Sequence, residues 1–108
     1  MSTINRMNSS YVFHPGEMIK DEIASRGIKQ KELASAMGVS SSILNEVING
    51  KRPVSTEYAL LLEATLGTPA YIWLRLQEDY NLRTIRESPS FLERLKSVTR
   101  LASSVAAL

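Results

Sequence analysis

The segment from residue 40 to residue 52, SSSILNEVINGKR, carries the side chains of this chain that are best suited to recognising another molecule. Its asparagine amides can hydrogen-bond N6 and N7 of one adenine together, and its serine hydroxyls can meet base edges or phosphate. A lysine and an arginine at its end add positive charge. This combination indicates hydrogen bonding to nucleic acid rather than the making or breaking of covalent bonds.

Positive charge gathers around this segment. The formal net charge of the whole chain is only +2, which is too small to indicate a nucleic-acid partner by itself. Residues 26–52 hold five basic side chains and two acidic ones, whereas residues 53–108 hold six of each. A solvated basic face would explain so small an excess about as well, so the charge supports a nucleic-acid partner without establishing one.

Two short helices joined at a glycine must position these side chains. Apolar residues recur at helical spacing from Gln30 to Met37, and Gly38 can adopt the left-handed conformation that ends a helix. Ser40 is a good N-cap for a second helix. The inward face of that helix holds Leu44, Val47 and Ile48, and its outward face holds Ser41, Ser42, Asn45, Glu46 and Asn49. This pattern predicts a helix-turn-helix, whose second helix enters the major groove of DNA.

The rest of the chain also has helical patterning, so we predict an all-α fold. No segment alternates with period two, and no sheet is expected. The first helix is predicted to begin at Pro15 and end at Gly27, and the fourth to begin after Ser55 and end at Gly67. The fifth is predicted to have Thr68 as its N-cap and Pro69 as its first residue, and to end at about Arg86.

A sixth helix is expected to fill the C-terminal segment, because Ser90 and Glu93 form a capping-box pattern at its start. Its apolar residues recur at spacings of four and three, at Phe91, Leu95, Val98, Ala102 and Val105. The run covers about two heptads, fewer than the three to four that indicate a coiled coil. This seam could therefore pack against a second copy of the chain or against Trp73 and Tyr80 of its own.

Several classes of function are excluded by what the sequence lacks. The chain has no cysteine and a single histidine, so it can build neither a disulfide nor a zinc site unaided. It shows no phosphate loop, no paired catalytic carboxylates and no metal-ligand spacing, so we predict neither an enzyme nor a cofactor. No apolar run approaches the ~20 residues that cross a bilayer, and MSTINRMNSS lacks a signal-peptide core, so we expect a cytoplasmic protein.

Three residues outside the helix-turn-helix have a functional and a structural interpretation. His14 could be a catalytic base, but no serine, cysteine or carboxylate stands in a triad pattern around it, which favours a capping or surface role. Trp73 and Tyr80 could form a stacking platform for bases. Their helical spacing beside Leu76 favours the core or a dimer contact instead.

The chain resembles a known family in three stretches. The helix-turn-helix followed by NGKRPVS is similar to the Cro and lambda-repressor type of DNA-binding domain, and the flanks HPGEMI and LGTPAYIWLRLQEDYNL are similar to the HigA antitoxins, also called plasmid-maintenance antidote proteins. The resemblance covers about His14 to Leu82. It implies a five-helix lambda-repressor-like domain and a homodimeric repressor that binds its own double-stranded operator DNA. It also implies neutralisation of a partner toxin, a HigB-like and RelE-like ribonuclease that cleaves messenger RNA.

The resemblance also implies roles for individual residues. Gln30 matches a phosphate-contacting glutamine, Ser41, Ser42 and Asn45 lie where base edges would be contacted, and Asn49, Lys51 and Arg52 match the turn that contacts the DNA backbone. The DNA-binding set that we predict is Gln30, Ser40, Ser41, Ser42, Asn45, Asn49, Lys51 and Arg52. Members of the family often carry Arg or Lys at the positions of Ser41 and Glu46. Glu46 could accept a hydrogen bond from cytosine N4 or be a solvated surface residue.

We expect residues 1–13 to form a flexible arm, residues 14–88 the DNA-binding domain, and residues 89–108 a C-terminal helix for packing or dimerisation. Two other functions remain open at this point. One is a phage-type repressor without a toxin partner. The other is a protein-binding module that has lost contact with an operator, which the serine-rich second helix makes conceivable.

Overall fold

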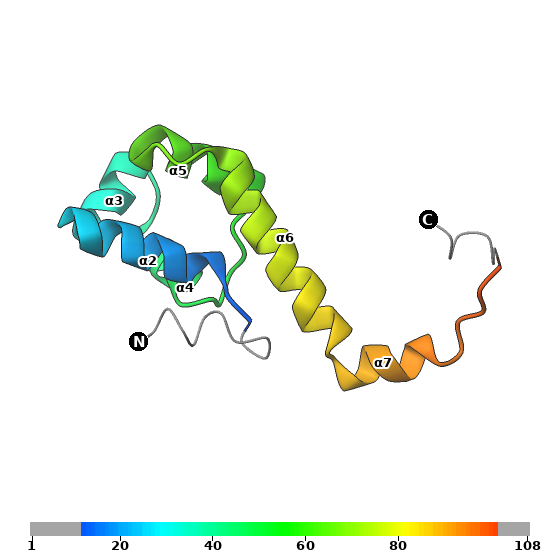
Figure 1. The fold of residues 1–108 in the computed structure, drawn as a ribbon. Coiled ribbons are helices and arrows are strands. Elements are labelled where there is room, and N and C mark those ends of the chain that lie inside the picture. Colours follow the sequence, from blue (N-terminus) through cyan, green and yellow to red (C-terminus); the bar gives the residue numbers. More distant parts are fainter. Residues whose placement is uncertain (1–11, 102–108) are drawn as a thin grey trace.

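The computed structural model of the protein describes residues 12–101, and these contain six α-helices and no strand (Figure 1). The helices are α2 (Pro15–Arg26), α3 (Gln30–Met37), α4 (Ser41–Ile48), α5 (Thr56–Leu66), α6 (Ala70–Arg86) and α7 (Pro89–Leu95). The prediction of an all-α fold with five helices and one further C-terminal helix is confirmed. No helix among the described residues is long and apolar enough to span a membrane.

The core lies between α2, α3, α4, α5 and the first half of α6. Its largest completely buried side chains are those of Ile19, Leu33, Leu44, Leu62 and Trp73. Trp73 is therefore part of the core, as its spacing predicts, and offers no stacking surface for bases. The rest of α6 projects away from this group of helices and carries α7 at its far end (Figure 1).

The N-terminus of α2 lies directly against the end of α4. A Cβ atom added at Gly16 would lie 2.3 Å from the carbonyl oxygen of Val47 and 2.6 Å from that of Ile48. Only glycine permits so close an approach of one helix to the backbone of another. At its other end, α2 is tied to α5, because the Arg26 guanidinium donates to the carbonyl of Leu66 at 2.7 Å.

His14 caps α2, which confirms the structural interpretation of this residue. Its Nδ1 accepts from the backbone N–H of Gly16 at 2.9 Å, and its own backbone N–H donates to the Glu17 carboxylate at 3.4 Å. The imidazole is buried and meets the ring of Tyr80 edge-on, with 4.7 Å between the ring centroids. Because Nδ1 is an acceptor here, the cap requires the neutral form of the ring.

Mild acid is expected to weaken the fold through His14. Burial lowers the pKa of His14 from its usual 6.5, and the opposing charge of Glu17 and a hydrogen bond with the Arg52 backbone do not cancel this effect. The unfolded chain therefore binds the proton more readily. The stabilisation by neutral His14 is complete above pH 6.5 and is lost as the pH falls toward the folded-state pKa. The free energy of unfolding in urea should consequently fall by up to about 1.4 kcal/mol per pH unit below that point.

The matched variant for this measurement is His14→Ser, because serine is a good N-cap that does not titrate. The variant should show a shallower loss of stability between about pH 7 and about pH 5 than the wild-type protein. Identical pH dependence in the two proteins would contradict a titrating cap at this position.

The start of α6 differs from the sequence prediction. Pro69 occupies the N-cap position and Ala70 is the first helical residue, whereas Thr68 and Pro69 were expected in these two roles. The cap is supplied from the preceding helix, since the Glu63 carboxylate accepts from the backbone N–H of Ala70 at 3.3 Å. The predicted end of this helix at Arg86 is confirmed.

The prediction of a long C-terminal helix with a capping box at Ser90 is wrong. Helix α7 begins at Pro89, with Ser88 at the N-cap, and ends at Leu95. Proline favours the first helical position, which moves the N-cap two residues, from Ser90 to Ser88. At the other end, the Ser97 hydroxyl donates to the carbonyl of Arg94 at 3.0 Å and competes with continuation of the helix.

The predicted seam is therefore helical only in part. Phe91 and Leu95 belong to α7, Val98 lies beyond its end, and Ala102 and Val105 lie outside the described residues. The second half of α6 and the segment after it nonetheless expose several large apolar side chains, which are Leu82, Ile85, Leu92, Leu95, Val98 and Leu101. We call Leu82, Ile85, Leu92 and Leu95 the α6–α7 apolar patch.

Candidate nucleic-acid interface

Helices α3 and α4 form the predicted helix-turn-helix. Gly38 ends α3 with φ 71°, in the left-handed conformation. The Ser40 hydroxyl then caps α4 by accepting from the backbone N–H of Ile43 at 3.3 Å. Burial of Leu44, Val47 and Ile48 against the core fixes the rotation of α4 about its axis. Its opposite side, with Ser41, Ser42, Asn45 and Asn49, consequently faces solvent.

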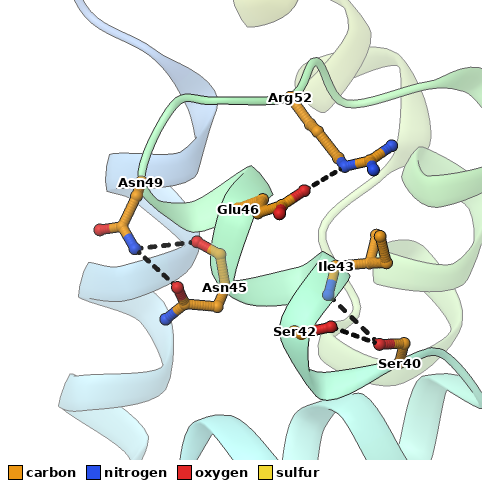
Figure 2. Close-up of polar contacts among 7 residues, drawn as sticks. All are labelled: Ser40, Ser42, Ile43, Asn45, Glu46, Asn49 and Arg52. Atoms are coloured by element: carbon orange, nitrogen blue, oxygen red, sulfur yellow. Dashed lines mark hydrogen bonds and ion pairs between the residues drawn. The ribbon is translucent and has the colours of Figure 1, made fainter.

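Four polar side chains at this exposed side, those of Ser40, Ser42, Asn45 and Asn49, are already hydrogen-bonded in pairs (Figure 2). The hydroxyls of Ser40 and Ser42 lie 3.0 Å apart. The Asn49 amide donates both to the side-chain oxygen of Asn45, at 3.1 Å, and to the Asn45 carbonyl, at 2.9 Å. These contacts hold the side chains in defined orientations, so less conformational freedom would be lost when they meet a ligand.

Asn45 keeps the hydrogen-bonding groups that an adenine requires. Its side-chain oxygen uses one lone pair for Asn49, which leaves the second lone pair free. Its side-chain NH₂ group has no partner among the described residues. One donor and one acceptor on the same amide match N7 and N6 of adenine in the major groove.

Asn45→Ala is expected to weaken binding to the operator by about 1–3 kcal/mol and to leave binding to a scrambled duplex of equal length almost unchanged. The reason is that a base contact carries sequence information, whereas a phosphate contact does not. Titration of both duplexes by fluorescence anisotropy measures the two losses side by side. Equal losses on the two duplexes would reassign Asn45 to the DNA backbone.

The turn after α4 is held by a side chain whose role the sequence pattern does not predict. The buried amide of Gln77, on α6, accepts from the backbone N–H of Val54 at 2.7 Å and donates to the Asn81 side chain at 3.0 Å. Gln77 lies four residues after the buried Trp73 and so faces the same side of α6. That spacing could have indicated that Gln77 faces the core, but a polar residue was not expected in the interior.

Lys51 and Arg52 stand on this turn, beside the exposed side of α4. Gly50 has φ 77°, and the backbone N–H of Lys51 donates to the Glu46 carbonyl at 2.8 Å, so the turn folds back toward the helix. Lys51 is exposed. Gln30, the remaining member of the predicted set, is half-buried at the first residue of α3. Of the eight predicted DNA-binding residues, seven thus lie together on α4, its N-cap and the turn after it. The eighth, Gln30, lies on α3.

If Lys51 meets a phosphate, Lys51→Ala should weaken binding to all DNA alike and reduce the slope of log K against log salt concentration by about one unit. Lys96→Ala is the control, since Lys96 is also an exposed lysine and lies just after α7, where it pairs with Glu93 at 3.3 Å. Its loss should leave the slope unchanged. A slope that does not change in Lys51→Ala would contradict the phosphate contact.

Glu46 has a partner that the sequence did not predict. Its carboxylate accepts a hydrogen bond from Nε of Arg52, and the two side chains form an ion pair on the outer side of α4 (Figure 2). Glu46 thus lies at the surface, in agreement with its interpretation as a solvated residue, but it is also ion-paired. The described residues contain no group of three side chains that could hold a metal ion.

A capped helix with a polar outer side, set behind a glycine turn and followed by a basic turn, defines the class of helix-turn-helix DNA-binding proteins. Residues 19–73 match the family described as helix-turn-helix. The chain belongs to this family and, within it, to the HigA-type antitoxins, as the following relatives show.

Virulence-associated protein A′ of Dichelobacter nodosus is 39% identical over 75 residues, which are 68% of this chain and 65% of that protein. Antitoxin HigA-1 of Vibrio cholerae is 38% identical over 68 residues, which are 62% of this chain and 64% of that one. The chain thus spans just under two thirds of the length of both relatives. The solved structure of antitoxin HigA of Pseudomonas aeruginosa with the higBA promoter has 28% identity and a TM-score of 0.78, and covers 85% of this chain and all of that one.

Proposed function

We propose that the protein is the antitoxin of a type II toxin–antitoxin module, which represses its own operon by sequence-specific DNA binding and neutralises a RelE-like toxin that cleaves messenger RNA. The observation that carries the DNA-binding half is the exposed side of α4, where Asn45 presents a donor and an acceptor together. The solved complex of the Pseudomonas HigA with the higBA promoter supports a promoter as the target. In this proposal the protein acts in the cytoplasm.

The DNA contacts are assigned as the sequence predicts. Ser41, Ser42 and Asn45 meet base edges in the major groove. Gln30, Asn49, Lys51 and Arg52 contact phosphates. Ser40 caps α4 and also contacts the DNA at the start of this helix. Residues 14–88 act as the DNA-binding domain, and residues 89–108 serve packing or dimerisation.

The protein is further proposed to act as a two-fold dimer. One recognition helix covers only a few base pairs, and pairing places two of them about 34 Å apart on one face of the DNA. The α6–α7 apolar patch lies on the segment that projects from the core, where a second copy can cover it (Figure 1). Exposed apolar surface of this kind is typical of an interaction site.

Gel retardation of the DNA upstream of the gene, with and without the product of the neighbouring gene, tests the proposal. We expect the protein alone to bind this DNA, and the neighbour's product to bind the protein and lose its ribonuclease activity. DNA binding without any effect on a neighbouring product would indicate a phage-type repressor. Absence of DNA binding would indicate a protein-binding module and contradict the proposal.

A further inference from the structure

Glu46 and Arg52 meet at the place where a DNA-binding protein would be expected to avoid negative charge. Their ion pair lies on the outer side of α4, and the Arg52 and Glu46 side chains remain 51% and 43% exposed. A carboxylate at this position repels phosphate, and it also reduces the positive charge of the one turn that carries two adjacent basic residues. The pair therefore requires an explanation other than general attraction to DNA.

The atoms that form the pair suggest one. Arg52 uses Nε, the inner nitrogen of the guanidinium, to bind Glu46. The two terminal Nη groups form no hydrogen bond with any described residue, and Figure 2 shows them directed away from Glu46. A guanidinium held by Nε has its plane fixed, while its terminal nitrogens stay available as a pair of parallel donors.

The position of Glu46 brings this fork of donors to the exposed side of α4. Glu46 lies four residues after Ser42 and three before Asn49, so the three side chains share one face of the helix. The turn returns toward the same face through the hydrogen bond from the Lys51 N–H to the Glu46 carbonyl. Arg52, although outside the helix, is thereby held beside the side chains that the proposed function assigns to base edges.

Two parallel donors match guanine, which presents O6 and N7 as two acceptors in the major groove. We propose that Glu46 and Arg52 act as one reading unit, in which Glu46 is a positioning residue and Arg52 recognises a single guanine in the operator. This inference rests on the proposed DNA binding and replaces the backbone contact that the resemblance implies for Arg52.

The two roles for Arg52 predict opposite effects of the same substitution. If Arg52 contacts phosphate, Glu46→Gln removes a repelling charge and frees the arginine, so binding to every DNA sequence becomes tighter. If Arg52 reads guanine, Glu46→Gln weakens the constraint on the guanidinium, so binding to the operator becomes weaker, while binding to unrelated DNA stays equal or becomes tighter. The ratio of specific to non-specific affinity then falls by about 5- to 150-fold, the range for one bidentate base contact.

The experiment measures affinities of wild-type protein, Glu46→Gln, Arg52→Lys and the double variant for operator duplexes in which each guanine in turn is replaced by 7-deazaguanine. Arg52→Lys keeps the positive charge but loses the fork of donors. At one position in each half-site, the modified base should weaken wild-type binding several-fold and weaken the binding of each of the three variants less. The double variant should lose no more specificity than Arg52→Lys alone, because the two residues act together.

Glu22→Gln controls for the change in net charge, since Glu22 forms an i,i+4 ion pair with Arg26 within α2, outside α4, its turn and the proposed dimer segment. A cooperative thermal unfolding transition is required of each variant, to establish that it is folded. The inference is overturned if Glu46→Gln binds all DNA more tightly with no loss of specificity, or if the variants stay as sensitive as the wild type to every modified guanine. If the wild-type protein itself does not discriminate the operator from unrelated DNA, the proposed function fails instead.

Discussion

Gly16→Ala is expected to destabilise the protein by about 3 kcal/mol, at the upper end of the range for overpacked sites. The added Cβ would lie 2.3 Å from the Val47 carbonyl oxygen and 2.6 Å from that of Ile48. Both are backbone atoms in the last turn of α4 and cannot rotate away as a side chain would. Helix α2 must therefore move off α4, and Ile19 loses its packing in the core. A loss of this size is a large part of the total stability of a small domain.

Gly67→Ala is the matched control for this substitution. Gly67 has φ 89°, and a Cβ there would meet nothing within 4 Å, so alanine faces only the cost of the left-handed conformation, about 1–2 kcal/mol. At Gly16, without the clash, alanine in place of glycine would favour the helix by up to about 1 kcal/mol. Urea denaturation compares the two variants with the wild type. A Gly16→Ala protein as stable as the wild type would contradict the close packing of α2 on α4.

The double substitution Leu82→Asp and Ile85→Asp is expected to produce a monomer and to weaken operator binding by about 100-fold or more, which is the scale of the gain from joining two binding modules. The two side chains are 42% and 51% exposed in the single chain, so charge at these positions leaves the core of the protomer intact. In the proposed dimer they would be buried without partners. Light scattering gives the oligomeric state, and the same samples give the affinity.

Leu60→Asp serves as the control, because Leu60 is equally exposed, at 53%, but lies on α5. A second arm of the experiment removes residues 89–108. A truncated protein that remains a dimer and binds an inverted repeat would show that α7 and the residues after it are dispensable. Monomers at micromolar concentration for both the whole and the truncated protein would contradict the dimer.

The helix-turn-helix could be predicted because its determinants are local. Gly38 ends α3 through its own backbone conformation, and Ser40 caps α4 with its own side chain. The apolar spacing of Leu44, Val47 and Ile48 fixes which side of α4 is exposed. The exposure of Ser41, Ser42, Asn45 and Asn49 follows from that rotation and agrees with the structure. Gln30, Lys51 and Arg52 were predicted from the family resemblance instead. The contacts of the whole set with DNA remain predictions.

Features that depend on residues far apart in sequence could not be predicted in this way. The bond from Val54 to Gln77 joins two elements through the buried interior, and a glutamine at that spacing carries no signal of its partner. The Glu46–Arg52 pair depends on the path of the turn between them. Conversely, the apolar spacing beyond Leu95 suggested a helix, but spacing alone does not supply the tertiary packing that stabilises a short helix.

Protection of guanine N7 from methylation by dimethyl sulfate on the DNA upstream of the gene tests sequence-specific binding through α4 most directly, because this atom lies in the major groove. Two clusters of protected guanines about ten base pairs apart, on one face of the helix, are the expected result for a dimer with two recognition helices. Protection should weaken in Asn45→Ala at the same protein concentration. Unaltered guanine reactivity at protein concentrations that saturate the DNA would contradict major-groove recognition by this protein.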